Sequence, residues 1–165
     1  FAWSSGGRRR SEVAGADMQF LRPLDSASYS YELVHSKTNQ AGDARPENFK
    51  PIVGVAATAL REWVAASQIH DGQIFRRIRK GGHLGEPLSP AAVRDIVLAR
   101  CSLAGIGGDY SAHSLRSGFV SEANRQSIPL AETMAMTGHR SVQSVLGYAR
   151  FDHGFGKAAN LVEVD

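Results

Sequence analysis

Short apolar and aromatic runs predict that the first third of the chain contains β-strands. Three runs rich in aromatic and branched residues lie at residues 18–22, 29–34 and 49–53, and turn-forming segments separate them. We expect these strands to form a small antiparallel sheet. A short helix over residues 9–14 should precede the sheet, after a Gly-Gly pair that lets the backbone bend closely.

Apolar residues at helical spacing predict that most of the remaining chain is α-helical. Such residues share one face of a helix expected over residues 56–66, with Trp63 in the core. Residues 73–78 and the segment around Leu84 are expected to pair loosely across two glycines.

A serine followed by a proline indicates where the next helix starts. Ser89 can cap the helix and Pro90 suits its first position, so we expect a helix from Pro90 to about residue 103 or 104. The residues expected to face inward on it are Val93, Ile96, Val97 and Cys101.

Three further helices are predicted over residues 111–125, 130–137 and 141–148. Gly138 should end the second of them, and Ser141 can cap the third. The predicted fold class is therefore mainly α with a small antiparallel β-sheet (α+β).

Composition places the chain among globular proteins. Its 165 residues suit one domain, 42% of them are hydrophobic and 21% are charged. No apolar run approaches the roughly 20 residues that span a bilayer, so no membrane partner is expected. The single cysteine excludes an internal disulfide and fits a reducing, cytoplasmic setting.

Positive charge is concentrated in two short segments, although the net charge is only +3. Arginines fill positions 8–10, and residues 75–80 hold four further cations. Such clusters suit a polyanionic partner such as nucleic acid, and they are also compatible with an ordinary solvated surface.

The segment from Tyr110 to Arg150 holds the side chains best suited to chemistry. His113 and Arg116 lie three residues apart, so on a helix they share a face near its start, where an anion is favoured. His139 follows Gly138, and Tyr148 lies nine positions after His139.

These residue types suit attack on a phosphodiester. Arginine stays charged and can bind two phosphate oxygens, and Arg9 could bracket the phosphate together with Arg116. Tyr148 could attack phosphorus, with His113 or His139 accepting or binding its proton. A lysine on a mobile hairpin could protonate the departing sugar oxygen. This chemistry requires no metal or other cofactor, and no carboxylate cluster of metal-binding type is present.

The order and spacing of these residues resemble the catalytic domain of the tyrosine recombinases, also called the phage integrase family. The family pattern is Arg, a hairpin Lys, His-x-x-Arg, His or Trp, and Tyr. Its first arginine sits in a G-x-R-x-S-E stretch, which matches residues 7–12 with Arg9 in place. Arg8 stands where leucine is usual, and Glu12 falls on the acidic position that buttresses the site.

The remaining positions of the pattern are also filled. Lys37 falls on the hairpin lysine, although Lys50 is a nearby alternative. The catalytic residues that the resemblance implies are Arg9, Lys37, His113, Arg116, His139 and Tyr148, with Glu12 in support. The resemblance spans residues 7 to about 150.

The resemblance implies a DNA recombinase that works on double-stranded DNA. It implies cleavage of one strand with a 3′-phosphotyrosyl link and a free 5′-hydroxyl, then religation to a partner strand. It also implies a homo-tetramer on DNA and is compatible with a monomer when DNA is absent. The tail, residues 151–165, would contact a neighbouring protomer, and residues 1–165 would form one catalytic domain without the usual N-terminal DNA-clamping domain.

Two other functions share parts of this pattern. A type IB topoisomerase would use similar chemistry to relax supercoiled DNA without strand exchange. A non-catalytic DNA-binding protein could keep the fold without the reaction, although all six active-site positions are filled here.

Overall fold

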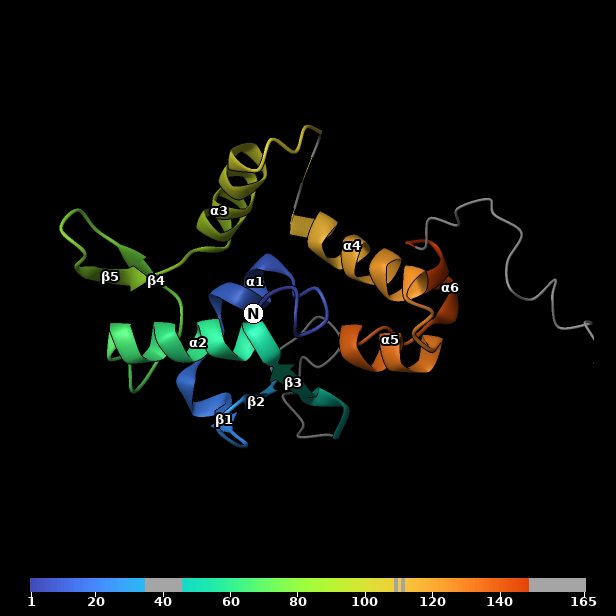
Figure 1. Cartoon of the computed structure of the whole chain (residues 1–165), viewed down its shortest axis with the longest axis horizontal. Coiled ribbons are helices and arrows are strands. Elements are labelled where there is room, and N and C mark those ends of the chain that lie inside the picture. The colour runs from blue at the N-terminus through green and yellow to red at the C-terminus, as the bar shows by residue number, and fades with distance from the viewer. Residues whose placement is uncertain (35–45, 109, 111, 149–165) are drawn as a thin grey trace, which may run out of the picture.

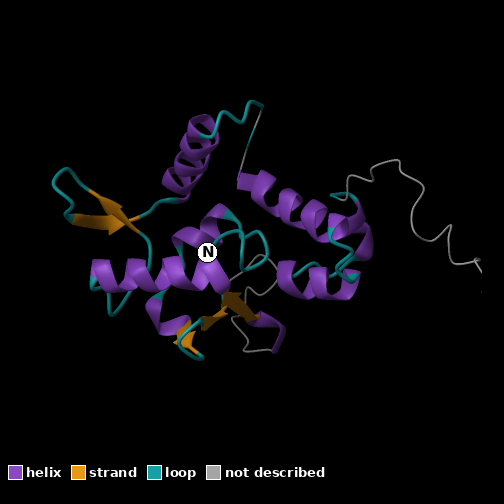
Figure 2. Ribbon diagram, viewed as in Figure 1, coloured by secondary structure: helices purple, strands orange, loops and turns teal. Residues whose placement is uncertain are grey.

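The computed structural model describes residues 1–34, 46–108, 110 and 112–148 (Figure 1). The strands are β1 (Leu21–Pro23), β2 (Ser28–Glu32), β3 (Phe49–Val53), β4 (Arg76–Ile78) and β5 (Leu84–Pro87). The α-helices are α1 (Arg10–Ala14), α2 (Gly54–Ser67), α3 (Pro90–Leu103), α4 (Ala112–Arg125), α5 (Leu130–Thr137) and α6 (Val142–Leu146). Helices dominate and the strands are short (Figure 2), which confirms the predicted α+β class. No described helix is both long enough and apolar enough to cross a membrane.

The predicted three-stranded sheet is present, antiparallel and in the order β1-β2-β3. Tyr31 on β2 lies opposite both Leu21 and Lys50. The sheet packs on α2, and residues of both elements, including Ile52 and Leu60, form a buried core. The connection from β2 to β3, where Lys37 was expected near the tip, lies outside the described residues at positions 35–45.

The first strand is shorter than predicted. Met18–Phe20 forms a 3₁₀ turn, and β1 begins only at Leu21. The Asp17 carboxylate accepts a hydrogen bond from the Gln19 backbone N–H at 3.0 Å, which favours a turn over an extended chain.

Capping signals located the middle helices well. The Ser89 hydroxyl accepts from the Ala92 backbone N–H at 3.1 Å at the start of α3, as predicted. α5 has the predicted bounds, and Gly138 ends it with φ of 73°, a conformation that glycine adopts at little cost. The predicted pairing of residues 73–78 with the segment around Leu84 is present as the antiparallel hairpin β4–β5. Trp63 packs against the core, and its indole N–H donates to the Ile74 carbonyl at 2.8 Å.

Two sequence-based predictions about helices are wrong. α6 ends at Leu146 and does not reach Tyr148, because Gly147, a poor helix former, comes next. Ile96 was expected to face inward, but 45% of it is exposed. α3 packs on α1 through Val93, and this contact covers a different part of α3.

Apart from α3, which packs on α1, the helices form two groups around the N-terminal segment, residues 1–9 (Figure 1). α1 and α2 lie with the three-stranded sheet on one side, and α4, α5 and α6 pack together on the other. The candidate catalytic residues come from both groups. The candidate site therefore lies where the two groups meet.

Candidate active site

Two glycines let the N-terminal segment touch α4 and α5. Gly7 has φ of 66°, and a Cβ there would lie 2.5 Å from the Cα of Arg116. At Gly6, with φ of 99°, a Cβ would collide with the carbonyl of Met136. Any larger residue would push the segment away from both helices. The bend expected at the Gly-Gly pair agrees with the positive φ of both glycines, and the close approach to α4 and α5 is a further finding of the structure.

Glu12 holds the first arginine at the start of α1. Its carboxylate accepts from the Arg9 guanidinium at 2.7 Å and from the Arg9 backbone N–H at 3.0 Å. These two bonds to one carboxylate fix the Arg9 side chain, which stays 30% exposed and able to meet a ligand.

Arg8 points the other way, into the protein. It is 1% exposed, its Nη2 donates to the Met136 carbonyl at 2.5 Å, and its Nη1 lies 3.9 Å from Glu12. Its Nε finds no hydrogen-bond partner among the described residues. Burial lowers the pKa of Arg8 to about 10, although Glu12 opposes the shift. Arg8 therefore ties the N-terminal segment to α5, and Arg9 is the more accessible guanidinium.

Arg116 lies at the centre of the cluster and is only 2% exposed. Its Nη2 donates to the Thr137 carbonyl at 2.6 Å, and its Nη1 lies 3.5 Å from the Gly7 carbonyl. Its Nε donates to His139 Nε2 at 3.2 Å. Burial, followed by the charge of Arg9, lowers the pKa of Arg116, while Glu12 and Tyr148 oppose the change. These bonds fix the plane of the guanidinium.

His139 is held from both ring nitrogens. Its Nδ1 lies 2.7 Å from the Thr137 hydroxyl, and its Nε2 faces Arg116. Burial lowers the pKa of His139 to about 4, and the cations Arg116, Arg9 and Arg8, together with His113, add to the shift. The imidazole is therefore neutral at physiological pH.

Tyr148 follows α6 and returns to α4. Its phenol oxygen lies 2.6 Å from Nε2 of His113, which is exposed. The two rings have centroids 5.3 Å apart, and the His139 ring lies 5.5 Å from the same phenol ring. The Ser121 hydroxyl donates to the Tyr148 carbonyl at 3.2 Å and so holds its backbone against α4.

The structure thus brings together His113, Arg116, His139 and Tyr148 by direct contact. Arg9 and Glu12 lie nearby, since the charges of both act on the pKa of Arg116. Sequence analysis missed Thr137 and Ser121, because a threonine or serine inside a helical segment has no signature of its own.

The two candidates for the hairpin lysine lie in different parts of the chain. Lys37 lies outside the described residues. Lys50 is 2% exposed, and its Nζ donates to the Ala135 carbonyl at 2.5 Å. Lys50 therefore links β3 to α5 from a buried position.

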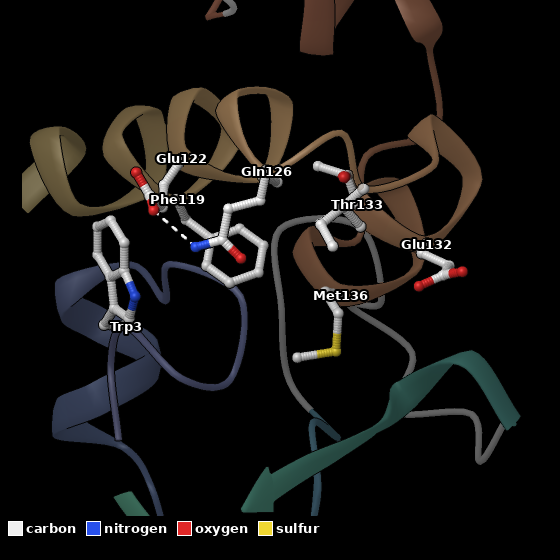
Figure 3. Close-up of a pocket in the computed structure, with 9 residues that line it drawn as sticks. Trp3, Phe119, Glu122, Gln126, Glu132, Thr133 and Met136 are labelled. Carbon is white, nitrogen blue, oxygen red and sulfur yellow. Dashed lines mark hydrogen bonds between the residues drawn. The ribbon is translucent and has the colours of Figure 1, made fainter. Parts of the chain in front are cut away.

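A separate apolar pocket of about 240 Å³ lies between the N-terminal segment, α4 and α5 (Figure 3). Trp3, Phe119 and Met136 contribute to its walls, and a bond from Gln126 to Glu122 of 2.6 Å lies at its edge. It shares no lining residue with the cluster around Tyr148.

Proteins of similar sequence belong to one family. The sequence model described as "Phage integrase family" matches residues 5–153. An "Integrase/recombinase xerD homolog" from Selenomonas ruminantium is 32% identical over 149 residues, covering 87% of this chain and 43% of the relative.

Two solved structures share the fold. The crystal structure of XerA recombinase matches with a TM-score of 0.71 at 14% identity, over 92% of this chain and 50% of that one. XerH site-specific recombinase, in a post-cleavage complex with a palindromic difH substrate, matches with a TM-score of 0.69 at 18% identity, over 95% of this chain and 42% of that one. The chain spans about half the length of the proteins it matches or less.

Proposed function

The chain belongs to the phage integrase family, and on this premise we propose that it is a site-specific DNA recombinase that cuts and rejoins strands through Tyr148. The XerD homologue is named as an integrase/recombinase, and the XerH complex contains its DNA substrate. We extend both properties to this chain.

The observation that carries the proposal is the 2.6 Å contact between the Tyr148 phenol and His113. A phenol with an ordinary pKa of about 10 is a weak nucleophile at neutral pH. A neutral imidazole beside it can accept the proton as the oxygen attacks. His113 is the partner proposed here, since it reaches the phenol oxygen directly, whereas His139 bonds to Thr137 and Arg116.

Arg9 and Arg116 are proposed to clamp the scissile phosphate. Both charges lower the pKa of His139, and the His139 ring lies 5.5 Å from the Tyr148 ring, which supports a role for both guanidiniums near the tyrosine. A phosphodiester gains negative charge as the nucleophile attacks, and preorganised cations stabilise that charge. Arg9 keeps an exposed edge for the ligand while Glu12 holds its orientation.

The proposed step balances as a transesterification. The Tyr148 oxygen forms a bond to phosphorus as the bond from phosphorus to the 5′-oxygen breaks. The phenol proton passes to His113, and a general acid protonates the departing 5′-oxygen. The product is a 3′-phosphotyrosyl link with a free 5′-hydroxyl, and the reverse reaction with a partner strand completes recombination.

Trapping on DNA is the direct test of the proposed function. A nicked suicide substrate loses its short 5′-hydroxyl fragment after cleavage, so religation is blocked and the covalent protein–DNA adduct accumulates. We expect peptide mapping of this adduct to find the nucleotide on Tyr148. Relaxation of any supercoiled plasmid without site preference would instead indicate a type IB topoisomerase.

Lys37 is proposed as the general acid, because Lys50 is buried and bonded to a main-chain carbonyl. We expect Lys37→Ala to slow cleavage of ordinary DNA by about 100-fold or more, within the usual range for loss of a general acid. A substrate with sulfur at the bridging 5′ position should restore the rate, because a thiolate departs without protonation. Single-turnover cleavage of both substrates is the measurement.

Lys50→Met is the matched variant for this experiment. It keeps an unbranched side chain of similar length in the buried position but removes the ammonium group. Any loss of activity in Lys50→Met should affect the oxygen and sulfur substrates equally. If sulfur rescues Lys50→Met and not Lys37→Ala, the two assignments must be exchanged.

The β4–β5 hairpin is proposed to bind the DNA backbone. Arg77, Arg79 and Lys80 are exposed there, and a hollow beside Arg77 and Arg79 is open to solvent. Each phosphate that a cation neutralises contributes about 0.9 to the slope of log affinity against log salt. We expect the double variant Arg77→Ala/Arg79→Ala to bind DNA more weakly and to reduce this slope by about 0.9 for each phosphate that is no longer neutralised.

Fluorescence anisotropy across a salt series measures that effect. Arg125→Ala is the control, since Glu122 already neutralises this arginine through bonds of 2.6 and 2.8 Å. An unchanged slope in the double variant would remove the hairpin from the DNA interface.

We further propose that the protein assembles as a tetramer on paired DNA sites in the prokaryotic cytoplasm. This part follows the family, since exchange between two duplexes needs four cleavage events.

A further inference from the structure

Three cationic side chains cap the last turn of α5. An α-helix leaves its final carbonyls without partners inside the helix. In α5 the successive carbonyls of residues 135–137 each accept a hydrogen bond from a different cation. The pairs are Lys50 with Ala135 at 2.5 Å, Arg8 with Met136 at 2.5 Å and Arg116 with Thr137 at 2.6 Å. Since the three cations come from β3, the N-terminal segment and α4, the end of α5 joins three parts of the fold.

The charge of the helix end suits the burial of these cations. Arg8 is 1% exposed, and Lys50 and Arg116 are each 2% exposed. The aligned peptide dipoles place about half a negative charge at the C-terminus of a helix, which favours cations there. α5 has eight residues, and a helix of this length is not stable alone. Its end therefore takes its position from the groups that bond to it.

Arg8 reaches the supports of both guanidiniums that are assigned to the scissile phosphate. Its Nη1 lies 3.9 Å from Glu12, the carboxylate that accepts from the Arg9 guanidinium at 2.7 Å. Its Nη2 donates to the Met136 carbonyl, one residue before the carbonyl that receives Arg116. One planar guanidinium thus connects the two supports, and its rigid fork fixes their spacing better than a flexible ammonium group could.

We propose that Arg8 is a positioning residue that sets the distance between Arg9 and Arg116. Lys50 supports it by holding the same turn of α5 from β3. The inference rests on the proposed function for its meaning in the reaction. Both positioning residues are buried, so they act through the two arginines of the site and not on the DNA itself.

Packing alone does not explain an arginine at position 8. Its Nε finds no hydrogen-bond partner among the described residues, and a buried donor without a partner destabilises a fold. Burial also opposes its charge and lowers the pKa of Arg8 to about 10. An apolar side chain of similar length would fill the space without these two costs. The advantage of a cation here therefore lies in the geometry that it imposes.

Arg8→Met separates positioning from stability. Methionine keeps an unbranched side chain but removes both amino groups and the unpartnered Nε. We expect single-turnover adduct formation at saturating DNA to slow by about tenfold, because a displacement of about 1 Å in an active site can cost about 100-fold. Urea unfolding should show little loss of stability. The DNA affinity and its salt slope should not change, because a buried arginine neutralises no phosphate.

Arg8→Lys and Arg10→Met are the matched variants. Lysine keeps a cation that can bond to the Met136 carbonyl, so Arg8→Lys should cleave faster than Arg8→Met. It should stay slower than the unaltered protein, because an ammonium group lacks the fork that spans both supports. Arg10 belongs to the same run of arginines but is exposed on α1. We expect Arg10→Met to cleave saturating DNA at the parental rate.

NMR with ¹⁵N-labelled arginine reports on Arg116 without DNA. The Arg116 Nε–H donates to His139 at 3.2 Å, so its chemical shift and its exchange with water show how the guanidinium is held. Arg116→Ala identifies the signal. We expect Arg8→Met and Lys50→Met each to shift this signal and to speed its exchange. Ile52→Val, a buried change on the same strand as Lys50, should leave the signal unchanged.

The outcomes separate this inference from the proposed function. An unaltered protein that forms no DNA adduct contradicts the recombinase proposal, whereas a shifted Arg116 signal in Arg8→Met still supports the positioning geometry. A folded Arg8→Met protein with the parental cleavage rate, or with the parental Arg116 signal, overturns the positioning role. If Arg8→Met does not fold, Lys50→Met decides by the same two measurements, because it frees the neighbouring carbonyl of the same turn.

Discussion

Replacing Tyr148 with phenylalanine is expected to abolish the covalent protein–DNA adduct while leaving DNA binding within a few-fold of the parent. Phenylalanine keeps the ring that packs near His113 and His139, with centroids 5.3 and 5.5 Å away, and removes only the oxygen that would attack phosphorus. The backbone at this position is held by Ser121 through its carbonyl, which the substitution does not change.

The effect should be total because the substitution removes the hydroxyl that contacts His113. The His113 imidazole would lose its 2.6 Å partner but would keep its place on α4. Adduct formation on a suicide substrate, resolved by denaturing electrophoresis, measures the effect on cleavage. Electrophoretic mobility shift on the same DNA measures binding.

Tyr110→Phe is the control for this experiment. The Tyr110 hydroxyl donates to the Gly107 carbonyl at 3.0 Å, in the loop before α4, so it already takes part in a local bond. Parental adduct levels are expected. Normal adduct formation by Tyr148→Phe would transfer the nucleophile to another residue and refute the proposed role.

Local sequence signals were enough to predict most of the fold. Ser89 and Pro90 fixed the start of α3, and Gly138 fixed the end of α5, because caps depend on the residues next to them. The Gly-Gly pair predicted a backbone bend, which agrees with its positive φ angles, but the contacts with Arg116 and Met136 could not be predicted. The exposure of Ile96 could not be predicted, since it depends on where α3 meets α1 and not on spacing within α3.

The candidate site was predicted less completely than the fold. The spacing of charged and aromatic residues can be read from the sequence alone. His113, Arg116, His139 and Tyr148 could therefore be predicted together. The contacts of Thr137 could not be predicted from the sequence, because they depend on the turn that Gly138 makes after it. The same holds for the three consecutive arginines, where only the structure separates the buried Arg8 from the accessible Arg9.

Arg116→Ala is expected to slow cleavage by about 100- to 1,000-fold, which corresponds to a loss of about 3–4 kcal/mol of transition-state stabilisation. Arg116 would supply a fixed charge against the phosphate, and alanine supplies none. The substitution also leaves the Thr137 carbonyl without its 2.6 Å donor in a buried position. Loss of that bond should lower the free energy of unfolding by about 1–3 kcal/mol.

Arg9→Ala separates the catalytic effect from the structural one. Arg9 is 30% exposed and bonds mainly to Glu12, so its removal should slow cleavage by a similar factor with a smaller change in stability. Single-turnover adduct formation gives the rates, and urea unfolding gives the free energies. If Arg9→Ala cleaves at the parental rate while Arg116→Ala is only unstable, neither guanidinium acts on the phosphate and Arg116 serves the fold alone. We expect the two variants to lose cleavage rate equally but to lose stability unequally. Both arginines would stabilise the phosphate in the reaction, whereas Arg116 makes more of the buried bonds that stabilise the fold.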